Sequence, residues 1–198
     1  MIREFRLADF FTLGNAACGA AAVFCTMVFV SERSPGYLHG AASLMLAALV
    51  LDVLDGRIAR WRKAHSAIGL ELDSLADIIS FGVAPATLGF SAGLNGGWDC
   101  VALIYFVCCG VSRLARFNVT AEKLSEGGEK VTHFEGTPNP TSIVLVGILA
   151  FAAWQGRLDE RLYGGVWSLG PWALHPMALL FVLSGTLMIS RTLRTPKL

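Results

Sequence analysis

Residues 52–77 read DVLDGRIARWRKAHSAIGLELDSLAD, and this stretch indicates how the chain is organised. Asp52 and Asp55 are three positions apart, and Asp73 and Asp77 are four apart, so each pair lies on one face of a helix. Between the pairs lies the polar and basic segment WRKAHS, which suits a turn. The stretch therefore predicts two antiparallel helices, each presenting two carboxylates near the same end.

The composition indicates a membrane protein. Hydrophobic residues make up 54% of the chain and charged residues only 16%, whereas soluble domains carry about a quarter charged residues. Apolar stretches approach the roughly 20 residues that a helix needs to cross a bilayer. We expect an all-α membrane protein, a single domain over residues 1–198, with six transmembrane helices and a short N-terminal interfacial helix. The interfacial helix is expected at 1–12, and the spans near 10–31, 37–60, 73–94, 98–117, 138–156 and 171–190.

The basic residues predict the topology. The chain has 16 Lys and Arg residues, and all except Arg33, Arg157 and Arg161 fall on the side of the N-terminus if six helices are threaded. Because basic residues concentrate on the cytosolic side of membrane proteins, we expect both termini in the cytosol. Near the N-terminus, Ile2, Phe5 and Ala8 alternate with Arg3, Arg6 and Asp9, which suits a helix lying on the membrane surface.

The four aspartates require an explanation at this boundary. Ionisable groups inside membrane segments are costly and usually functional, and Asp52 lies roughly 12 Å along its helix from Arg60. Oxygen ligands without Cys or His favour Mg²⁺, Mn²⁺ or Ca²⁺. Ion pairing with nearby basic residues is the alternative, although it does not explain the helical spacing of the acids. Those basic residues are Arg57, Arg60, Arg62 and Lys63.

Other classes of site find little support. The five cysteines show no zinc-type spacing, and inside apolar stretches cysteine behaves as a small hydrophobe. No basic run is interleaved with aromatic residues, so we do not expect nucleic acid as a partner.

The aspartate stretch also carries a family signature of eight fixed positions. These are Asp52, Asp55, Gly56, Ala59, Arg60, Gly69, Asp73 and Asp77. With every spacing met, the chain closely resembles the CDP-alcohol phosphatidyltransferases. Within that family, four further segments resemble the phosphatidylserine synthases. They are residues 12–19, 77–86, 113–118 and 134–140.

The resemblance implies a reaction and a site. The phosphatidyl group of CDP-diacylglycerol would pass to the hydroxyl of L-serine, giving phosphatidylserine and CMP, in a homodimer whose active site faces the cytosol. Two divalent ions, Mg²⁺ or Mn²⁺ with Ca²⁺ as a possible occupant, would bind the four aspartates, and Asp77 would be the general base. The residues implied at the CDP-diacylglycerol are Gly56, Ala59, Arg60, Gly69 and Asn15.

Serine itself is zwitterionic and needs partners of both signs. Arg113, Arg116 and Lys130 are available for its carboxylate, and Glu135 or Asn118 for its ammonium group. Instead of binding serine, the two arginines could anchor the helix at the cytosolic face. Lys130 and Glu135 could instead belong to a solvated loop.

Two rival functions remain open. One is the same chemistry on glycerol 3-phosphate or an inositol phosphate, although a phosphorylated acceptor calls for a tighter basic cluster than the chain displays. The other is a divalent-cation transporter that uses the four acids as its permeation site.

Overall fold

The computed structural model of the protein describes residues 7–62, 67–127, 133–190 and 194–196. Its helices are α1 (Leu7–Glu32), α2 (Pro35–Arg62), α3 (Ala67–Asp77), α4 (Ala84–Ala92), α5 (Gly97–Gly127), α6 (Ile143–Trp154) and α7 (Ala178–Ile189), with a π-helix, η2 (Ile78–Val83), and 3-10 turns η3 (Asn139–Ser142) and η4 (Asp159–Arg161). Short strands pair antiparallel, β1 (His133–Glu135) with β4 (Arg194–Pro196) and β2 (Trp167–Leu169) with β3 (Trp172–Leu174). The described chain is thus a helical bundle with two small ribbons, which the all-α prediction did not include.

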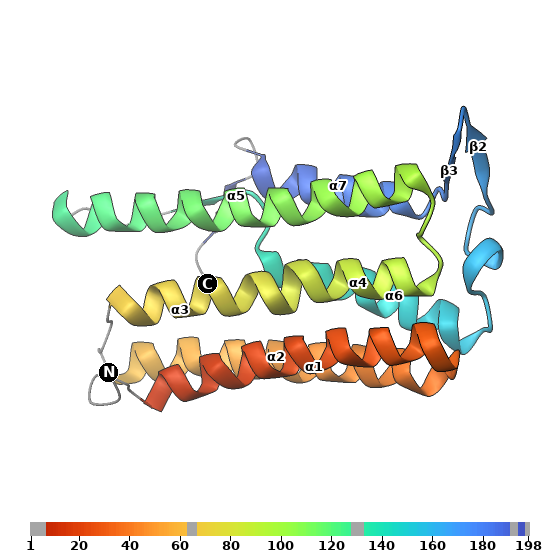
Figure 1. Ribbon diagram of the computed structural model, residues 1–198. Coiled ribbons are helices and arrows are strands. Elements are labelled where there is room, and N and C mark those ends of the chain that lie inside the picture. The colour runs from red at the N-terminus through yellow and green to blue at the C-terminus, as the bar shows by residue number, and fades with distance from the viewer. Residues whose placement is uncertain (1–6, 63–66, 128–132, 191–193, 197–198) are drawn as a thin grey trace.

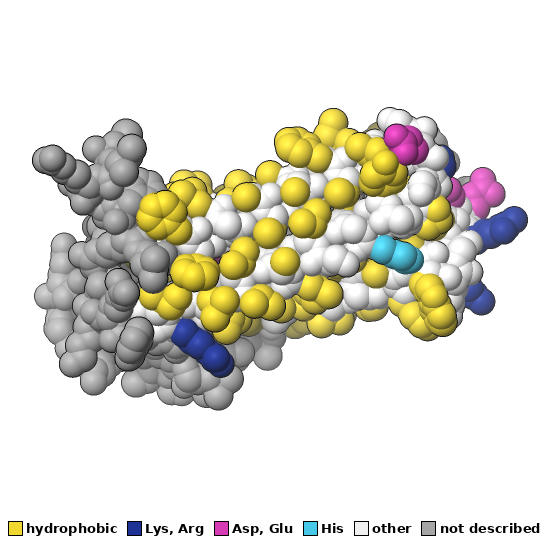
Figure 2. Space-filling view, turned by 90° about the horizontal axis from the view of Figure 1, so that it is seen from below, with side chains coloured by type: hydrophobic (Ala, Val, Ile, Leu, Met, Phe, Trp, Pro, Cys, Tyr) yellow, Lys and Arg dark blue, Asp and Glu magenta, His cyan; other side chains and the backbone are white. Residues whose placement is uncertain are grey.

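Four helical stretches of the described chain are long and apolar enough to cross a membrane. They are Asp9–Glu32, Pro35–Ile58, Ile68–Ala92 and Gly97–Thr120. Large apolar side chains point outward from them; Phe24 and Met27 are 64% and 62% exposed, and Figure 2 shows such side chains along one face. This pattern fits an integral membrane protein, in which lipid covers the apolar surface.

The two remaining apolar helices, Asn139–Trp154 and Ala178–Ile189, are shorter than the other four. They occupy the expected spans near 138–156 and 171–190, so the total of six spans stays a prediction. Residues 1–6 of the expected interfacial helix lie outside the described chain, and residues 7–12 are the first turns of α1.

The helices form three layers (Figure 1). Helices α1 and α2 run antiparallel to each other on one side. In the middle, α3, η2 and α4 follow one another as a nearly continuous rod. On the other side α5 runs alongside α7, while α6 packs against α2 and α4. We call the end where α2 stops and α3 starts the aspartate end, and the opposite end, which carries β2 and β3, the hairpin end.

The middle layer is held against α1 by a close contact at η2. A Cβ atom on Gly19 would lie 2.8 Å from Ser80 Cα, so a larger residue would push the helices apart. The Ser80 hydroxyl donates to the Asn15 carbonyl at 2.9 Å. Pro85 follows at the start of α4, and since proline has no N–H to close a regular helical turn, the wider π-helix before it relieves the conflict. Asp77, the residue before η2, is thereby fixed relative to α1.

The hairpin end differs from the sequence prediction. The expected span near 171–190 begins with β3 at 172–174, and its helix, α7, begins only at Ala178. Asp99 is fully buried there and accepts hydrogen bonds from the backbone N–H of His175 at 2.7 Å and of Gly96 at 3.0 Å. Its Oδ2 also lies 2.6 Å from His175 Nδ1. This contact ties the hairpin to the start of α5.

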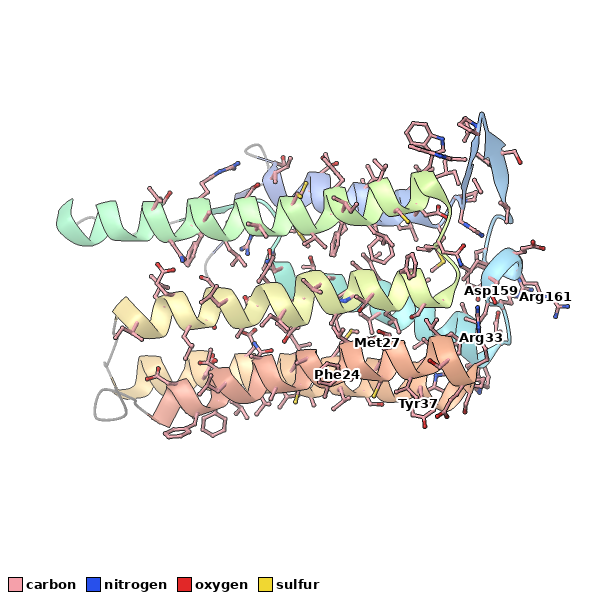
Figure 3. The ribbon with its side chains drawn as sticks, in the orientation of Figure 1. Phe24, Met27, Arg33, Tyr37, Asp159 and Arg161 are labelled. Carbon is pink, nitrogen blue, oxygen red and sulfur yellow. The ribbon has the colours of Figure 1, made fainter. Side chains whose placement is uncertain are left out.

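The hairpin end carries two of the three arginines that were predicted to lie apart from the other basic residues. Arg33 and Arg161 lie at this end (Figure 3), and Arg33 pairs with Asp159 at 3.1 Å. The aspartate cluster lies toward the other end of the bundle. The cluster and these two arginines are therefore separated along the helix axes.

Candidate metal centre

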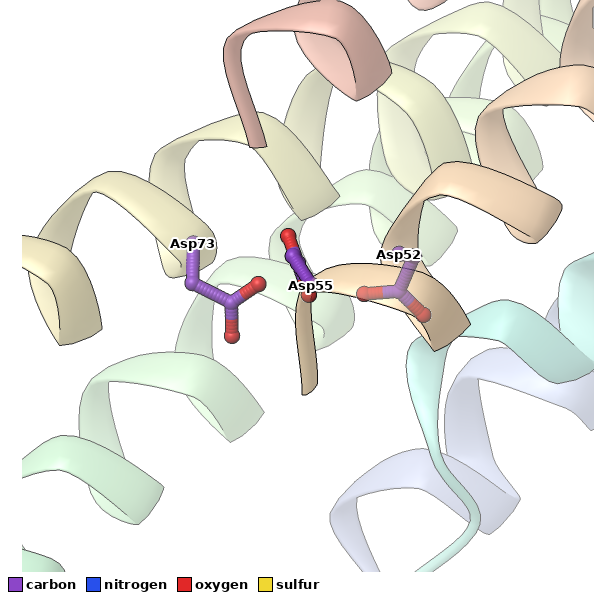
Figure 4. Close-up of side chains that lie close together, drawn as sticks. All are labelled: Asp52, Asp55 and Asp73. Atoms are coloured by element: carbon purple, nitrogen blue, oxygen red, sulfur yellow. The ribbon is translucent and has the colours of Figure 1, made fainter. Parts of the chain in front are cut away.

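Three carboxylates meet where α2 and α3 face each other. Asp52, Asp55 and Asp73 each offer an oxygen, and these oxygens all lie within 4.8 Å of one another (Figure 4). Asp55 is 6% exposed, and the other two side chains are half-buried. The predicted antiparallel pair of acid-bearing helices is therefore confirmed in its geometry.

Asp77 joins this group from one turn further along α3. Its side chain is 7% exposed and lies beside the Asp52 carboxyl group, with which it interacts. The Asn15 amide donates to Asp77 Oδ1 at 3.4 Å. The structure thus brings the four predicted aspartates and Asn15 to one place.

Thr12 also belongs to the site, and sequence reasoning assigned it no role. Its hydroxyl donates to Asp55 Oδ2 at 2.8 Å, and its side chain is 4% exposed. Thr12 and Asn15 are three positions apart and therefore share one face of α1. That spacing within residues 12–19 was the available signal, but only packing shows which carboxylates the face meets.

The donor chemistry of the cluster fits a divalent cation. All its ligand atoms are carboxylate oxygens, which hard cations prefer. Asp73 Oδ1 and Asn15 Oδ1 are buried oxygens without a hydrogen-bond partner among the described residues. None of the described Lys or Arg side chains forms an ion pair with the four aspartates. Since adjacent carboxylates repel one another, a bound cation is the natural counter-charge.

Space for a larger ligand exists beside the acids. A Cβ atom on Gly56 would meet none of the described atoms within 4 Å, so the described part of the chain leaves space on α2 next to Asp55. Gly69 is half-buried on the facing helix α3. Ala59 and Arg60 lie on α2, but their side chains are outside the described part of the chain.

On the opposite side of Asp77, α5 presents two half-buried arginines. Arg113 Nη1 donates to Asn139 Oδ1 at 3.3 Å, and Arg116 Nη1 donates to the Ile189 carbonyl at the end of α7 at 3.4 Å. Arg113 is also close enough to Asp77 to interact with it electrostatically. Of the two predicted serine contacts on α5, Arg113 thus lies near the carboxylates, whereas Arg116 lies against the end of α7.

The other predicted serine contacts are placed less directly. Asn118 accepts a hydrogen bond from Ser74 at 3.0 Å and donates to Glu71 at 3.2 Å, so it joins α5 to α3. Glu135 ends β1, but its side chain, like the whole of Lys130, lies outside the described residues. The roles of these three residues stay predictions.

Comparison with known proteins identifies the relationship. The family model described as CDP-alcohol phosphatidyltransferase matches residues 5–186. The chain belongs to this family. The resemblance found in the aspartate signature is confirmed, and the matched range includes the four aspartates, Thr12, Asn15 and both α5 arginines.

Several curated members of the CDP-alcohol phosphatidyltransferase family are similar to the chain. A CDP-diacylglycerol–serine O-phosphatidyltransferase of Saccharomyces cerevisiae is 38% identical over 200 aligned residues, covering 100% of this chain and 72% of the relative. One of Bacillus subtilis is 35% identical over 144 residues, covering 71% of this chain and 72% of the relative. One of Helicobacter pylori is 40% identical over 129 residues, covering 64% of this chain and 52% of the relative.

Proposed function

We propose that this phosphatidyltransferase transfers the phosphatidyl group of CDP-diacylglycerol to the hydroxyl of L-serine, giving phosphatidylserine and CMP. The observation that carries this activity is the four-aspartate cluster on α2 and α3, in a chain whose reported relatives all bear the serine transferase name. The half-buried Arg113 of α5 interacts electrostatically with Asp77 and so adds positive charge beside the cluster for an acceptor with a carboxylate.

In this proposal the four aspartates hold divalent metal, Mg²⁺ or Mn²⁺, as two ions. The clustering of carboxylate oxygens and the unpartnered Asp73 Oδ1 support this role. When bound, such ions neutralise phosphate charge and polarise the attacked phosphorus. Thr12 orients the Asp55 carboxylate by its hydrogen bond.

Asp77 is the general base of the proposed reaction. It takes the proton from the serine hydroxyl as the hydroxyl oxygen forms its bond to the diacylglycerol-linked phosphorus. The bond from that phosphorus to the bridging oxygen breaks, and CMP leaves with the electron pair. The Asn15 amide holds the Asp77 carboxylate in place, and alignment of this kind supplies much of the rate.

Binding of CDP-diacylglycerol is assigned to the α2–α3 side of the cluster. The space that the described residues leave at Gly56 supports it, because a bulky ligand could approach the carboxylates there. The full proposed set is Gly56, Ala59, Arg60, Gly69 and Asn15.

The proposed membrane arrangement follows from the substrates. Diacylglycerol tails stay in the bilayer whereas CMP and serine are soluble in water, so the reaction must lie at a membrane boundary. We assign the aspartate end and both termini to the cytosol, with residues 1–198 forming one domain of six spans and residues 1–12 lying on the membrane surface. The predicted homodimer completes this arrangement, and measurement of the mass of the detergent-solubilised particle tests it.

The deciding experiment measures CMP release by the purified full chain in detergent with CDP-diacylglycerol. We expect CMP only when both L-serine and Mg²⁺ or Mn²⁺ are present, with phosphatidylserine as the lipid product. Glycerol 3-phosphate and an inositol phosphate serve as matched acceptors. Turnover with either of these acceptors but not with serine would show that the protein performs the same reaction on another alcohol. Metal uptake into vesicles without any CMP release would favour a cation transporter instead.

A further inference from the structure

A second polar group lies beside the aspartates, between α5 and η3. Asn139 is 1% exposed and Ser142 is 0% exposed, both at the segment that leads into α6. Asn139 Nδ2, Ser142 Oγ and Arg113 Nε are buried atoms without a hydrogen-bond partner among the described residues. All three are able to donate a hydrogen bond.

The geometry of η3 places these groups together. Side chains at positions i and i+3 of a 3-10 turn eclipse one another, so Asn139 and Ser142 share a face. Arg113 approaches the same face from α5, since it donates to Asn139 Oδ1 at 3.3 Å. That bond uses the acceptor of the Asn139 amide and leaves its donor end without a partner.

The group is adjacent to Asp77. A Cβ atom on Gly110, one turn before Arg113 in α5, would lie 3.3 Å from Ile78 Cδ1 and 3.5 Å from Asn139 Nδ2. Ile78 directly follows Asp77 in the chain, so η3 lies against the residue next to the proposed base. Arg113 is also within electrostatic reach of Asp77.

Buried donors without partners indicate a ligand. Leaving one such group unsatisfied costs enough that folded proteins rarely do so without a reason. Here three donors, one of them cationic, converge and no described carboxylate accepts from them. A ligand with several acceptor oxygens and negative charge satisfies this pattern best.

Given the proposed serine transferase activity, we propose that Arg113, Asn139 and Ser142 form the subsite for the serine carboxylate. The phosphates of CDP-diacylglycerol are the other anionic candidates. They belong near the carboxylate cluster on α2 and α3, whereas this subsite lies on the opposite side of Asp77. A serine carboxylate held there leaves the hydroxyl, only a few bonds away, directed toward the base. Asn139 and Ser142 are thereby residues that select an amino-acid acceptor.

The test compares Ser142→Ala and Asn139→Ala with the unsubstituted protein, using the CMP-release assay in detergent. Loss of one hydrogen bond to a charged group should raise the KM for serine by roughly 10- to 150-fold, while the KM for CDP-diacylglycerol stays the same. Ser112→Ala is the matched control, because Ser112 is exposed on α5 next to Arg113 and bonds only to the Cys108 carbonyl among the described residues. It should leave both constants unchanged.

Serinol, in which a hydroxymethyl group replaces the serine carboxylate, separates carboxylate binding from a structural role. With serinol as acceptor, the two substitutions should not alter the KM. An unchanged serine KM in both variants, or a raised KM for CDP-diacylglycerol, would overturn the subsite. Equal KM values for serine and serinol in the unsubstituted protein would overturn it without any variant. Absence of serine-dependent CMP release from the unsubstituted protein would instead reject the proposed function itself.

Discussion

Asp99→Ala tests whether the buried contact at the hairpin end is a major source of stability. Asp99 lies at the start of α5, far along the bundle from the aspartate cluster (Figure 1). Its carboxylate is the common acceptor for two backbone N–H groups and the His175 ring. Truncation to alanine leaves these groups without their acceptor in a place where the aspartate was 0% exposed.

The size of the effect follows from these contacts. Each buried donor that loses its partner costs about 1–3 kcal/mol, and three groups lose their contact with Asp99. We expect the free energy of unfolding to fall by about 3–5 kcal/mol, since water reaches part of the space left by the side chain. For a chain of this size, 1 kcal/mol shifts Tm by about 2–4 °C, so Tm should drop by about 6–20 °C.

Thermal unfolding of the detergent-solubilised protein, followed by tryptophan fluorescence, measures the shift. Trp98 and Trp172 pack edge to face at 5.2 Å across α5 and the hairpin, so they report on this contact. Asp159→Asn is the matched control at the same end, because its pair with Arg33 is about half exposed and should contribute at most about 1 kcal/mol. A Tm drop below about 2 °C for Asp99→Ala, or one equal to the control, would refute this account. Below the new Tm, CMP release per folded molecule should be unchanged.

The remaining predictions concern the aspartate end. Asp73→Asn removes one charged metal ligand and should abolish CMP release with membrane insertion intact; substantial turnover at saturating Mg²⁺ or Mn²⁺ would contradict its role. Asp77→Asn should still bind CDP-diacylglycerol but release almost no CMP, and normal turnover with weakened metal binding would leave Asp77 as a ligand only. Thr12→Val loses the 2.8 Å bond to Asp55 and should raise the metal concentration for half-maximal activity about 10-fold. Thr12→Ser keeps the hydroxyl and should leave this concentration unchanged. Arg116→Ala should raise the serine KM by roughly 10- to 150-fold; an unchanged serine KM with weaker CDP-diacylglycerol binding would reassign this arginine to the phosphates.

The aspartate cluster could be predicted because the pattern that defines it lies within one short stretch of the sequence. Helical spacing of three and four residues puts each carboxylate pair on one face, and a short basic turn brings the faces together at one end. Arg113 was named only as one of three cations available for the serine carboxylate, and its place near Asp77 comes from the packing of α5. Roles for Asn139 and Ser142 were not predicted, because their importance depends on which buried atoms lack partners in the folded chain.

Contacts between distant segments explain the other differences. His175 contacts Asp99, which is 76 positions away in the chain, so no local pattern indicates this pair. The apolar run after residue 162 suggested a span from 171, but two short strands use its first part to cover the hairpin end. Hydrophobicity alone does not distinguish an apolar ribbon from the start of a helix over such a short segment.

Helical periodicity, apolar length and the spacing of charges thus suffice to place the acids on two helices of a membrane-type bundle. These patterns involve residues that are close together in the chain, so they can be recognised from the sequence alone. The distances that make a site depend instead on how α1, α5 and η3 pack around α3. Close packing at Gly19 and Ser80 brings Asn15 to Asp77 and Thr12 to Asp55, because backbone approach is limited by side-chain size on two separate helices. That complementarity is a property of the folded chain and has no counterpart in any single stretch of sequence.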